Sequence, residues 1–595
     1  MHVGYIVAAC AVVGVLAGMQ ADAKDIRLVR DGKSEYTIVL SKDASPSEKH
    51  AAQELQKFLL EISGAELRIA TEGGKLPRRM IVLGDGETLR SLNVHIEFND
   101  LGEEGFAIKT AWPHLVVAGG RLRGTMYGVY TFLEEVLGCR WYSSKVSRIP
   151  KKRTITLKPL DIIQKPDFEY REPGYTDAFD ADWAARNRAN SSQARLDKVR
   201  GGKIGYFPFV HTFNNLVPPW KYAKDHPEYY SLIEGTRKTE GTQLCMTNPE
   251  VVRIATETVL RWIQERPDAK IYSVSHNDWY ENCQCEKCKA VDEEEGSPCG
   301  LLLRFVNAIA AEVEKKHPDK LIDTLAYQWT EKPPRITKPR ANVRVRLCAI
   351  FQCQYHPYER CEKNKAFVER LREWSRITDN LYVWHYNTNF PNYLVPMPDL
   401  DELAADIPMY KRFAVKGIYA EGNYSSTGGF MDELKAYLIA KLLWNTKADA
   451  RAVRDDFLNG YFGGAGKPIS QFLDLLHNKV RTQNIHGDIW DTVDAQFLSP
   501  EVMAESERLF DEAERIADNP DALERVKHAR LSLEYVKIMR EVNRVGASGT
   551  PEEKAAALKK LEAFVRECEA DGMTQLKEGR SIRARLEELA GPLRQ

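Results

Sequence analysis

The sequence lacks an excess of basic residues and, beyond its first 23 residues, lacks any long apolar run. Lys and Arg number 84 and Asp and Glu number 85 among 595 residues, a formal net charge of -1 at pH 7. Because nucleic-acid binding depends on clustered positive charge, a nucleic acid is not the expected partner. A membrane-spanning helix needs about 20 consecutive apolar residues. We therefore expect a soluble mature protein with no membrane span.

The first 23 residues have the pattern of a secretory signal peptide. Tyr5 to Met19 is apolar but too short to span a bilayer comfortably, and Ala21-Asp22-Ala23 is a small-x-small cleavage site before Lys24. An exported chain can oxidise its thiols. We therefore expect a secreted or periplasmic protein in which closely spaced cysteines form disulfides or bind a metal.

The apolar pattern divides the remaining chain into three predicted domains. Residues 24–162 alternate short strands with amphipathic helices, which predicts a small α/β domain. Residues 163–446 contain eight apolar or aromatic runs, mostly separated by helical patterns, which predicts a (β/α)8 barrel. Residues 447–595 lack strand signals and predict a helical domain. The eight predicted barrel strands are residues 169–175, 203–210, 243–246, 270–274, 321–329, 343–351, 381–386 and 417–420.

Four cysteines are expected to lie together beside the fourth predicted strand. Cys283, Cys285 and Cys288 occupy six residues, and Cys245 follows the third predicted strand. This set fits either a structural zinc site or two disulfides, and the spacing alone leaves both open. We interpret the cluster as scaffold, because catalytic zinc keeps an open position and uses His or carboxylate ligands. No cofactor is expected to be required for catalysis.

Function in a barrel of this kind lies at the carboxyl ends of the strands. The side chains expected there are carboxylates, amides and aromatic rings, a mixture that suits a neutral polyol such as an oligosaccharide. The predicted substrate-binding residues are Trp183, Arg186, Asn187, His211, His276, Trp279, Glu295, Tyr327, Trp329, Trp384, His385, Tyr386 and Asn423.

Two carboxylates are the best-placed candidates for catalysis. Cleavage of a glycosidic bond needs an acid for the leaving oxygen and a group that stabilises the oxocarbenium-like centre. Asp278 follows the fourth predicted strand and Glu421 follows the eighth. The alternative for each is a helix cap or an ion pair with an arginine such as Arg186 or Arg346.

Several segments resemble known carbohydrate-active families. Gly119 to Glu135, GGRLRGTMYGVYTFLEE, resembles the α/β domain that precedes the barrel in β-hexosaminidases and α-glucuronidases. Other segments resemble glycoside hydrolase family 163, whose known members are endo-β-N-acetylglucosaminidases acting on complex N-glycans. These segments are Ser275-His276-Asn277-Asp278-Trp279, Glu295-Gly296-Ser297, Leu302 to Asn307, Leu325 to Gln328 and Gly417 to Glu421. The likeness covers most of residues 25–446.

The resemblance implies a hydrolase that cuts at β-linked N-acetylglucosamine in an oligosaccharide or glycoprotein glycan, with a retaining and substrate-assisted mechanism. In substrate-assisted hexosaminidases, adjacent Asp and Glu follow strand four; one orients the substrate acetamide and the other is the acid. This chain has Asn277 and Asp278 there. The resemblance thus implies Asp278 as acid/base, Asn277 as acetamide or hydroxyl ligand, and Glu421 as second catalytic carboxylate or sugar anchor.

Two alternatives remain open at this point. An exo-acting α-glucuronidase or β-hexosaminidase shares the N-terminal domain, and a uronate substrate requires a basic group such as Arg186 or Arg346 near its carboxylate. A non-catalytic glycan-binding protein is the other alternative. It is favoured if only one carboxylate lies at the barrel mouth.

Overall fold

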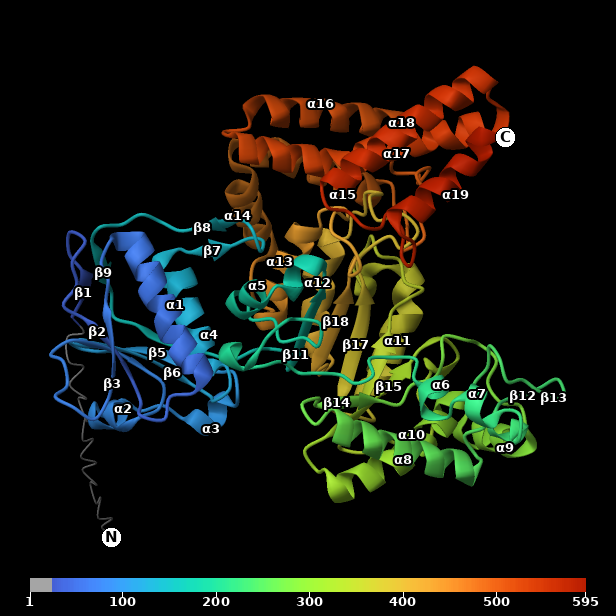
Figure 1. Ribbon diagram of the computed structural model, residues 1–595, viewed down its shortest axis with the longest axis horizontal. Helices are drawn as coiled ribbons and strands as arrows, with labels where there is room; N and C mark the ends of the chain where they lie inside the picture. Colours follow the sequence, from blue (N-terminus) through green and yellow to red (C-terminus); the bar gives the residue numbers. More distant parts are fainter. Residues whose placement is uncertain (1–23) are drawn as a thin grey trace, which may run out of the picture.

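The computed structural model describes residues 24–595, so the predicted signal peptide lies outside the described residues. Three groups of elements follow one another along the chain (Figure 1). The N-terminal sheet, in blue, lies beside a central parallel sheet, and the C-terminal helices, in red, lie along the top. Among the described residues, no helix is long and apolar enough to cross a membrane.

The N-terminal region contains a six-stranded mixed sheet in the order β10-β5-β6-β4-β2-β3. Its strands are β2 (Thr37–Leu40), β3 (Arg68–Thr71), β4 (Met80–Leu83), β5 (Phe106–Ala111), β6 (His114–Gly119) and β10 (Asp161–Gln164). A separate pair joins β1 (Ile26–Val29) to β9 (Ile155–Leu157). The alternation of short strands and helices predicted for this part of the chain is confirmed.

Helices cover both faces of this sheet. The helix α1 (Pro46–Ser63) begins at a capping box formed by Ser45 and Glu48, which satisfies two free backbone N–H groups. It packs on one face together with α4 (Gly124–Thr131), which continues as a π-helical turn (Phe132–Leu137). The short helices α2 (Glu87–Ser91) and α3 (Phe98–Leu101) contribute apolar side chains to the core on the other face.

The central sheet consists of six parallel strands in the order β11-β18-β17-β16-β15-β14. They are β11 (Tyr170–Gly174), β14 (Ile271–Ser273), β15 (Leu321–Ala326), β16 (Val343–Cys348), β17 (Leu381–Tyr386) and β18 (Gly417–Glu421). In the register of the sheet, Glu421 lies beside Tyr386 of β17 and Gly174 of β11. The last residue of β18 is therefore held between two strands.

The structure shows a curled parallel half-barrel, and the predicted closed (β/α)8 barrel is not confirmed. Residues 203–210 and 243–246 form no strand of the sheet. Tyr206 makes a single parallel bridge to Ile271, and Leu244 makes a single antiparallel bridge to Tyr230. The first of these segments contains Gly205 and Pro208. Glycine weakens a strand and proline cannot donate to a ladder, so regular pairing stops there.

Helices follow most strands of the central sheet. They are α5 (Ala181–Arg186), α6 (Phe213–Leu216), α7 (Pro219–Tyr222), α8 (Pro249–Glu265), α9 (Glu286–Glu295), α10 (Pro298–Lys316), α11 (Lys365–Ser375), α12 (Leu400–Arg412) and α13 (Asp432–Trp444). Two short antiparallel pairs lie in loops: β7 (Arg140–Trp141) with β8 (Ser147–Arg148), and β12 (Leu232–Ile233) with β13 (Thr236–Arg237). Only a 3-10 turn (Gln328–Thr330) lies between β15 and β16 in the described chain.

The C-terminal region is helical, as predicted. Its helices are α14 (Ala450–Phe462), α15 (Gly466–Thr482), α16 (Pro500–Ile516), α17 (Pro520–Ser548), α18 (Pro551–Ala570) and α19 (Ile582–Arg594). The loop between α18 and α19 returns to the central sheet: Tyr393 N donates to Leu576 O at 3.0 Å, and Glu578 N donates to Phe390 O at 2.9 Å. This contact brings C-terminal side chains to the ends of the strands. The proposed domain boundaries stay predictions.

Candidate active site

A cavity of about 720 Å³ opens at the carboxyl ends of the central strands. Its carboxylates are Asp278, Glu281, Glu421 and Glu578. Its aromatic residues are Trp279, Tyr280, Tyr327, Phe351, Trp384, Tyr386, Phe390, Tyr424 and Trp490. Among the described residues, no Lys or Arg lines it. Acidic groups beside flat apolar rings are suited to a neutral, hydroxylated ligand.

Glu421, the last residue of β18, is a buried carboxylate in this cavity. Its side chain accepts hydrogen bonds from Trp384 Nε1 at 2.8 Å and from the Tyr419 hydroxyl at 3.4 Å. Burial raises the pKa of Glu421 to about 8, and the negative charge of Glu578 adds to the rise. A carboxyl group with this pKa holds a proton at neutral pH, so Glu421 can act as a proton donor.

Asp278 also faces the cavity but lies in the exposed loop after β14. Its Oδ1 accepts hydrogen bonds from the Tyr327 hydroxyl at 3.2 Å and from Gln328 Nε2 at 3.4 Å. Burial, with the charge of Asp278, raises the pKa of Tyr327 well above its usual value, so the phenol stays protonated and donates. The environments of the two carboxylates therefore differ.

Glu578 is a further carboxylate of the cavity, and the sequence did not predict it. It accepts a hydrogen bond from the Tyr424 hydroxyl at 2.9 Å. Burial raises the pKa of Glu578, and the charge of Asp278 adds to the rise, against the hydrogen bond from Tyr424. In the sequence Glu578 lies between two charged helices. No local pattern there separates it from the solvated carboxylates of the same region.

Seven predicted site residues lie in the cavity: Asp278, Glu421, His211, Trp279, Tyr327, Trp384 and Tyr386. The Trp384 and Tyr386 rings stack with centroids 5.9 Å apart and planes inclined by 14°. His211 has a positive φ of 53° and its Nδ1 donates to His276 O at 2.9 Å, which leaves Nε2 free of this bond. These residues combine hydrogen-bonding groups with apolar rings in one space.

His276 and Trp329 support the cavity from behind and do not line it. His276 is buried, and its ring stacks on Tyr327 with a centroid separation of 5.9 Å. Burial lowers the pKa of His276 to about 4, so it is neutral near pH 7. Trp329 packs on His276 and donates from Nε1 to Trp279 O at 3.1 Å. Both residues position the Tyr327 and Trp279 groups that line the cavity.

The structure does not support the predicted role of Asn277 as an acetamide ligand. Its Nδ2 donates to Thr242 O at 2.7 Å and to Asn214 Oδ1 at 3.0 Å. The amide is thereby bonded to a neighbouring loop and does not line the cavity. The next residue along the chain, Asp278, lines the cavity.

Trp183, Arg186 and Asn187, which were predicted to bind substrate, do not line this cavity. All three lie on or just after α5, which packs against the N-terminal region. Their side chains bond to that region: Arg186 pairs with Glu54 at 2.8 Å, Trp183 Nε1 donates to Tyr142 O, and Asn187 Nδ2 donates to Trp141 O. The sequence pattern does not show the surface on which α5 packs.

His385, Asn423 and Glu295 also lie outside the cavity. His385 sits between Trp384 and Tyr386 on β17, and because strand residues alternate in direction it faces Tyr410, whose hydroxyl lies 2.8 Å from its Nδ1. Asn423 Nδ2 bonds to Ser426 O within its own loop. Glu295 is buried and pairs with Arg304 at 2.6 Å. Each side chain is part of the scaffold.

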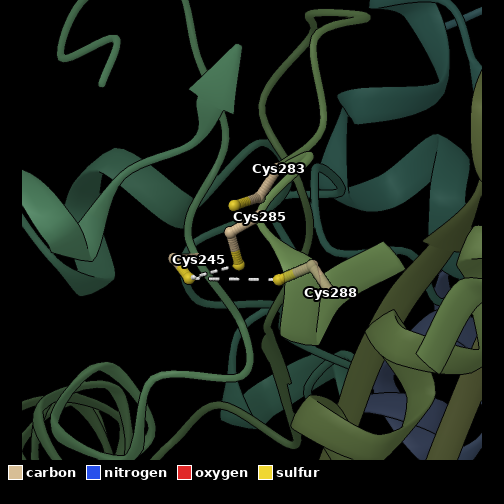
Figure 2. Close-up of side chains that lie close together, drawn as sticks. All are labelled: Cys245, Cys283, Cys285 and Cys288. Carbon is tan, nitrogen blue, oxygen red and sulfur yellow. Dashed lines mark hydrogen bonds between the residues drawn. The ribbon is translucent and has the colours of Figure 1, made fainter. Parts of the chain in front are cut away.

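The predicted thiol cluster forms beside the loop that carries Asp278 (Figure 2). Cys245 Sγ lies 3.7 Å from Cys285 Sγ and 3.9 Å from Cys288 Sγ. One sulfur from each of the four residues, with Cys283, lies within 4.8 Å of the others. Zinc–sulfur bonds of about 2.3 Å in a tetrahedron give sulfur–sulfur edges of about 3.8 Å, whereas a disulfide bond is about 2.05 Å long. The residues fit a four-thiolate zinc site.

Comparison with known families identifies two matching regions. Residues 141–474 match the family described as Domain of unknown function (DUF4838). This match covers more than half of the chain, so the protein belongs to that family. Residues 27–132 match the N-terminus of glycosyl hydrolase family 67, in agreement with the predicted resemblance of the α/β region. Membership of glycoside hydrolase family 163 is not confirmed.

Solved structures share the fold. A family GH115 4-O-methyl-α-glucuronidase with specificity for decorated arabinogalactans aligns with a TM-score of 0.61 and 13% identity, over 96% of this chain and 80% of that one. A family 89 glycoside hydrolase from Clostridium perfringens in complex with PUGNAc aligns with a TM-score of 0.52 and 11% identity, over 93% and 70%. The chain therefore has a fold found in glycoside hydrolases. A search of curated proteins found no match.

Proposed function

We propose that this protein is an exported glycoside hydrolase that cleaves at a β-linked N-acetylglucosamine in a neutral glycan. The fold and the family 67 N-terminal match support hydrolysis of a glycosidic bond. The observation that carries the proposal is a single cavity that holds Glu421 and Asp278 in different environments among aromatic rings.

In this proposal Glu421 is the general acid. Protonation of the leaving oxygen needs a carboxyl group that keeps its proton at working pH, and burial raises the pKa of Glu421 to about 8. This assignment moves the acid role from Asp278, which the resemblance implied, to Glu421. The Trp384 indole, which donates to Glu421 Oε2, keeps the carboxyl oriented.

Asp278 and Tyr327 form the second catalytic group. The Asp278 carboxylate can accept the N–H of a substrate acetamide, and the Tyr327 hydroxyl can donate to the acetamide carbonyl. This would direct the carbonyl oxygen toward the anomeric carbon, as substrate assistance requires. The 3.2 Å hydrogen bond between the two side chains keeps them together before substrate binds.

The charges around the cavity favour a neutral sugar over a uronate. A uronate carboxylate needs a basic partner, yet no Lys or Arg lines the described cavity. Arg186 pairs with Glu54 at 2.8 Å, and Arg346 pairs with Asp323 at 3.2 Å beneath the site. Both arginines that could have served the glucuronidase alternative are therefore occupied elsewhere.

The alternative of a non-catalytic binding protein is disfavoured by the number of carboxylates. That alternative requires only one acidic group at the strand ends, whereas the cavity holds Asp278, Glu421 and Glu578. A binding site for a neutral glycan gains little from a buried carboxyl with a raised pKa, since burial of an ionisable group is costly.

The test is a substrate panel with matched variants. Complex N-glycans, an aryl β-N-acetylglucosaminide and α-glucuronide oligosaccharides are incubated with wild type, Glu421→Gln, Asp278→Asn and the exposed-residue control Glu293→Gln. We expect turnover of N-acetylglucosamine substrates, a loss of about 10²- to 10⁴-fold in Glu421→Gln, and an unchanged control. Turnover of uronates alone would overturn the substrate assignment. Full activity in both cavity variants would overturn the residue roles.

A further inference from the structure

We propose a second metal site, a structural zinc site formed by Cys353, His356, Cys361 and His486. One ligand atom from each of these residues lies within 4.8 Å of the other three. The first three residues belong to the loop between β16 and α11, and His486 belongs to the segment between α15 and α16. The site therefore joins the central sheet to the C-terminal helical region.

The separations of the ligand atoms fit a tetrahedral zinc ion. His486 Nδ1 lies 3.4 Å from Cys353 Sγ and 3.5 Å from Cys361 Sγ, and His356 Nδ1 lies 3.5 Å from Cys353 Sγ. Zinc bonds of about 2.3 Å to sulfur and about 2.0 Å to nitrogen give sulfur–nitrogen edges of about 3.5 Å in a tetrahedron. All three distances match this edge.

The donor set and its burial favour zinc in a structural role. Two thiolates and two imidazoles form a complete tetrahedral set with no position left for a substrate. Cys353 and Cys361 are buried, with 4% and 2% of their surfaces exposed. Buried soft ligands in a closed set hold a metal that is not exchanged during catalysis.

The site lies directly behind one wall of the active-site cavity. Ile489 and Trp490, which line the cavity, follow His486 closely in the chain. Phe351, another lining residue, precedes Cys353, and its ring centroid is 6.0 Å from that of Trp490. Backbone bonding reinforces the junction, since Gln354 N donates to Gly487 O at 2.9 Å. Zinc at this site would fix the wall formed by these three side chains.

The four-thiol cluster of Cys245, Cys283, Cys285 and Cys288 independently supports a zinc site on another wall. Its sulfur–sulfur separations of 3.7 and 3.9 Å match a tetrahedral edge, as described above. Trp279, Tyr280 and Glu281, which line the cavity, lie just before Cys283. We therefore expect two zinc ions per chain, each holding a different loop of the cavity.

The test measures metal content and ligands in the full chain, exported from cells grown with zinc and dialysed without chelator. We expect two zinc ions per chain by elemental analysis. X-ray absorption at the zinc edge should then give an average of three sulfur and one nitrogen ligands per ion. One zinc with four sulfur ligands, or no zinc, overturns the Cys2His2 site. One zinc with two sulfur and two nitrogen ligands overturns the four-thiolate site.

Variants assign each ion to its ligands. His486→Ala should lose one zinc and leave the other with sulfur ligands only, whereas Cys285→Ser should leave the remaining zinc enriched in nitrogen. Cys139→Ala, a buried cysteine outside both clusters, should retain both ions. If His486→Ala fails to fold, the absorption spectrum of the wild type still decides. A disulfide between Cys353 and Cys361 in metal-free wild type overturns the proposal. These readouts do not depend on turnover, so they stand apart from the proposed activity.

Discussion

Glu421 and Asp278 face the same cavity, but Glu421 ends a strand inside the sheet and Asp278 lies in a loop. Glu421 ends a strand that is hydrogen-bonded on both sides, to β17 and to β11, and it is 6% exposed. Asp278 lies in an exposed loop beyond β14, a strand of three residues. The sheet alone positions the first carboxylate, whereas the second depends on contacts made by its loop.

This difference accounts for the proposed proton-donor role of Glu421 and for the place of the cysteine cluster next to the Asp278 loop. A buried position raises the pKa of Glu421 and makes it the proton donor. The exposed loop of Asp278 continues into Cys283, Cys285 and Cys288, which can anchor it through a metal. The loop that carries Trp490 likewise follows a metal-ligand residue, His486. Glu421 ends a strand, whereas Asp278 and Trp490 lie on loops next to a cluster of metal-ligating side chains.

The largest effect should come from Glu421→Gln, which removes the proposed proton donor. Wild-type kcat/KM should fall as pH rises through about 8, because the Glu421 carboxyl loses the proton that it must donate. The variant should lose about 10²- to 10⁴-fold in kcat at pH 7 and should show no such alkaline fall. A wild-type rate that climbs steadily from pH 7 to 9 would contradict the assignment.

The loop of Asp278 should respond to loss of its thiol cluster, while Glu421 should not. In the double variant Cys283→Ser/Cys285→Ser we expect kcat to fall up to about 10²-fold, since displacement of a catalytic group by about 1 Å costs this much. The fall of kcat/KM at alkaline pH, which Glu421 controls, should keep the same midpoint pH. If the double variant instead shifted the pH dependence of kcat/KM and left the maximal rate unchanged, the cluster would act on Glu421 and not on the Asp278 loop.

Trp490→Ala tests the wall supplied by the helical region. Loss of one stacking ring should cost about 0.5–1.5 kcal/mol in sugar binding, or roughly two- to twelvefold in KM, with little change in kcat. Trp220→Ala is the control, because Trp220 is 78% exposed and lies outside the cavity. Equal effects of the two substitutions would show that the wall does not contact substrate.

The smallest expected effect is that of Glu578→Gln on the pKa of the proposed acid, Glu421. The charge of Glu578 helps to raise the pKa of Glu421, so its removal should move the alkaline limb of kcat/KM toward lower pH. Glu587→Gln, at an exposed residue of α19, should leave the limb in place. A shift toward higher pH in Glu578→Gln would show that the two carboxylates are coupled in the opposite sense.

Much of the fold could be predicted because strand and helix periods are local. The strands β15 to β18 lie close to the predicted segments 321–329, 343–351, 381–386 and 417–420, and helices separate most of them, as predicted. The alternation rule also separates Trp384 and Tyr386 from His385, which points the other way along β17. Asn277 and α5 were misplaced because hydrogen-bond partners and packing surfaces are set by distant parts of the chain.

The sequence by itself determined the strand that precedes Asp278, the strand that ends at Glu421, and the close spacing of Cys283, Cys285 and Cys288. Only the tertiary structure decided which carboxylate is buried, that Glu578 and Trp490 complete the cavity, and that His486 meets Cys353 and Cys361. The physical reason is that periodicity reports which face of an element is buried. The partner that covers this face, and thus the charge and metal environment there, depends on contacts between segments far apart in the chain.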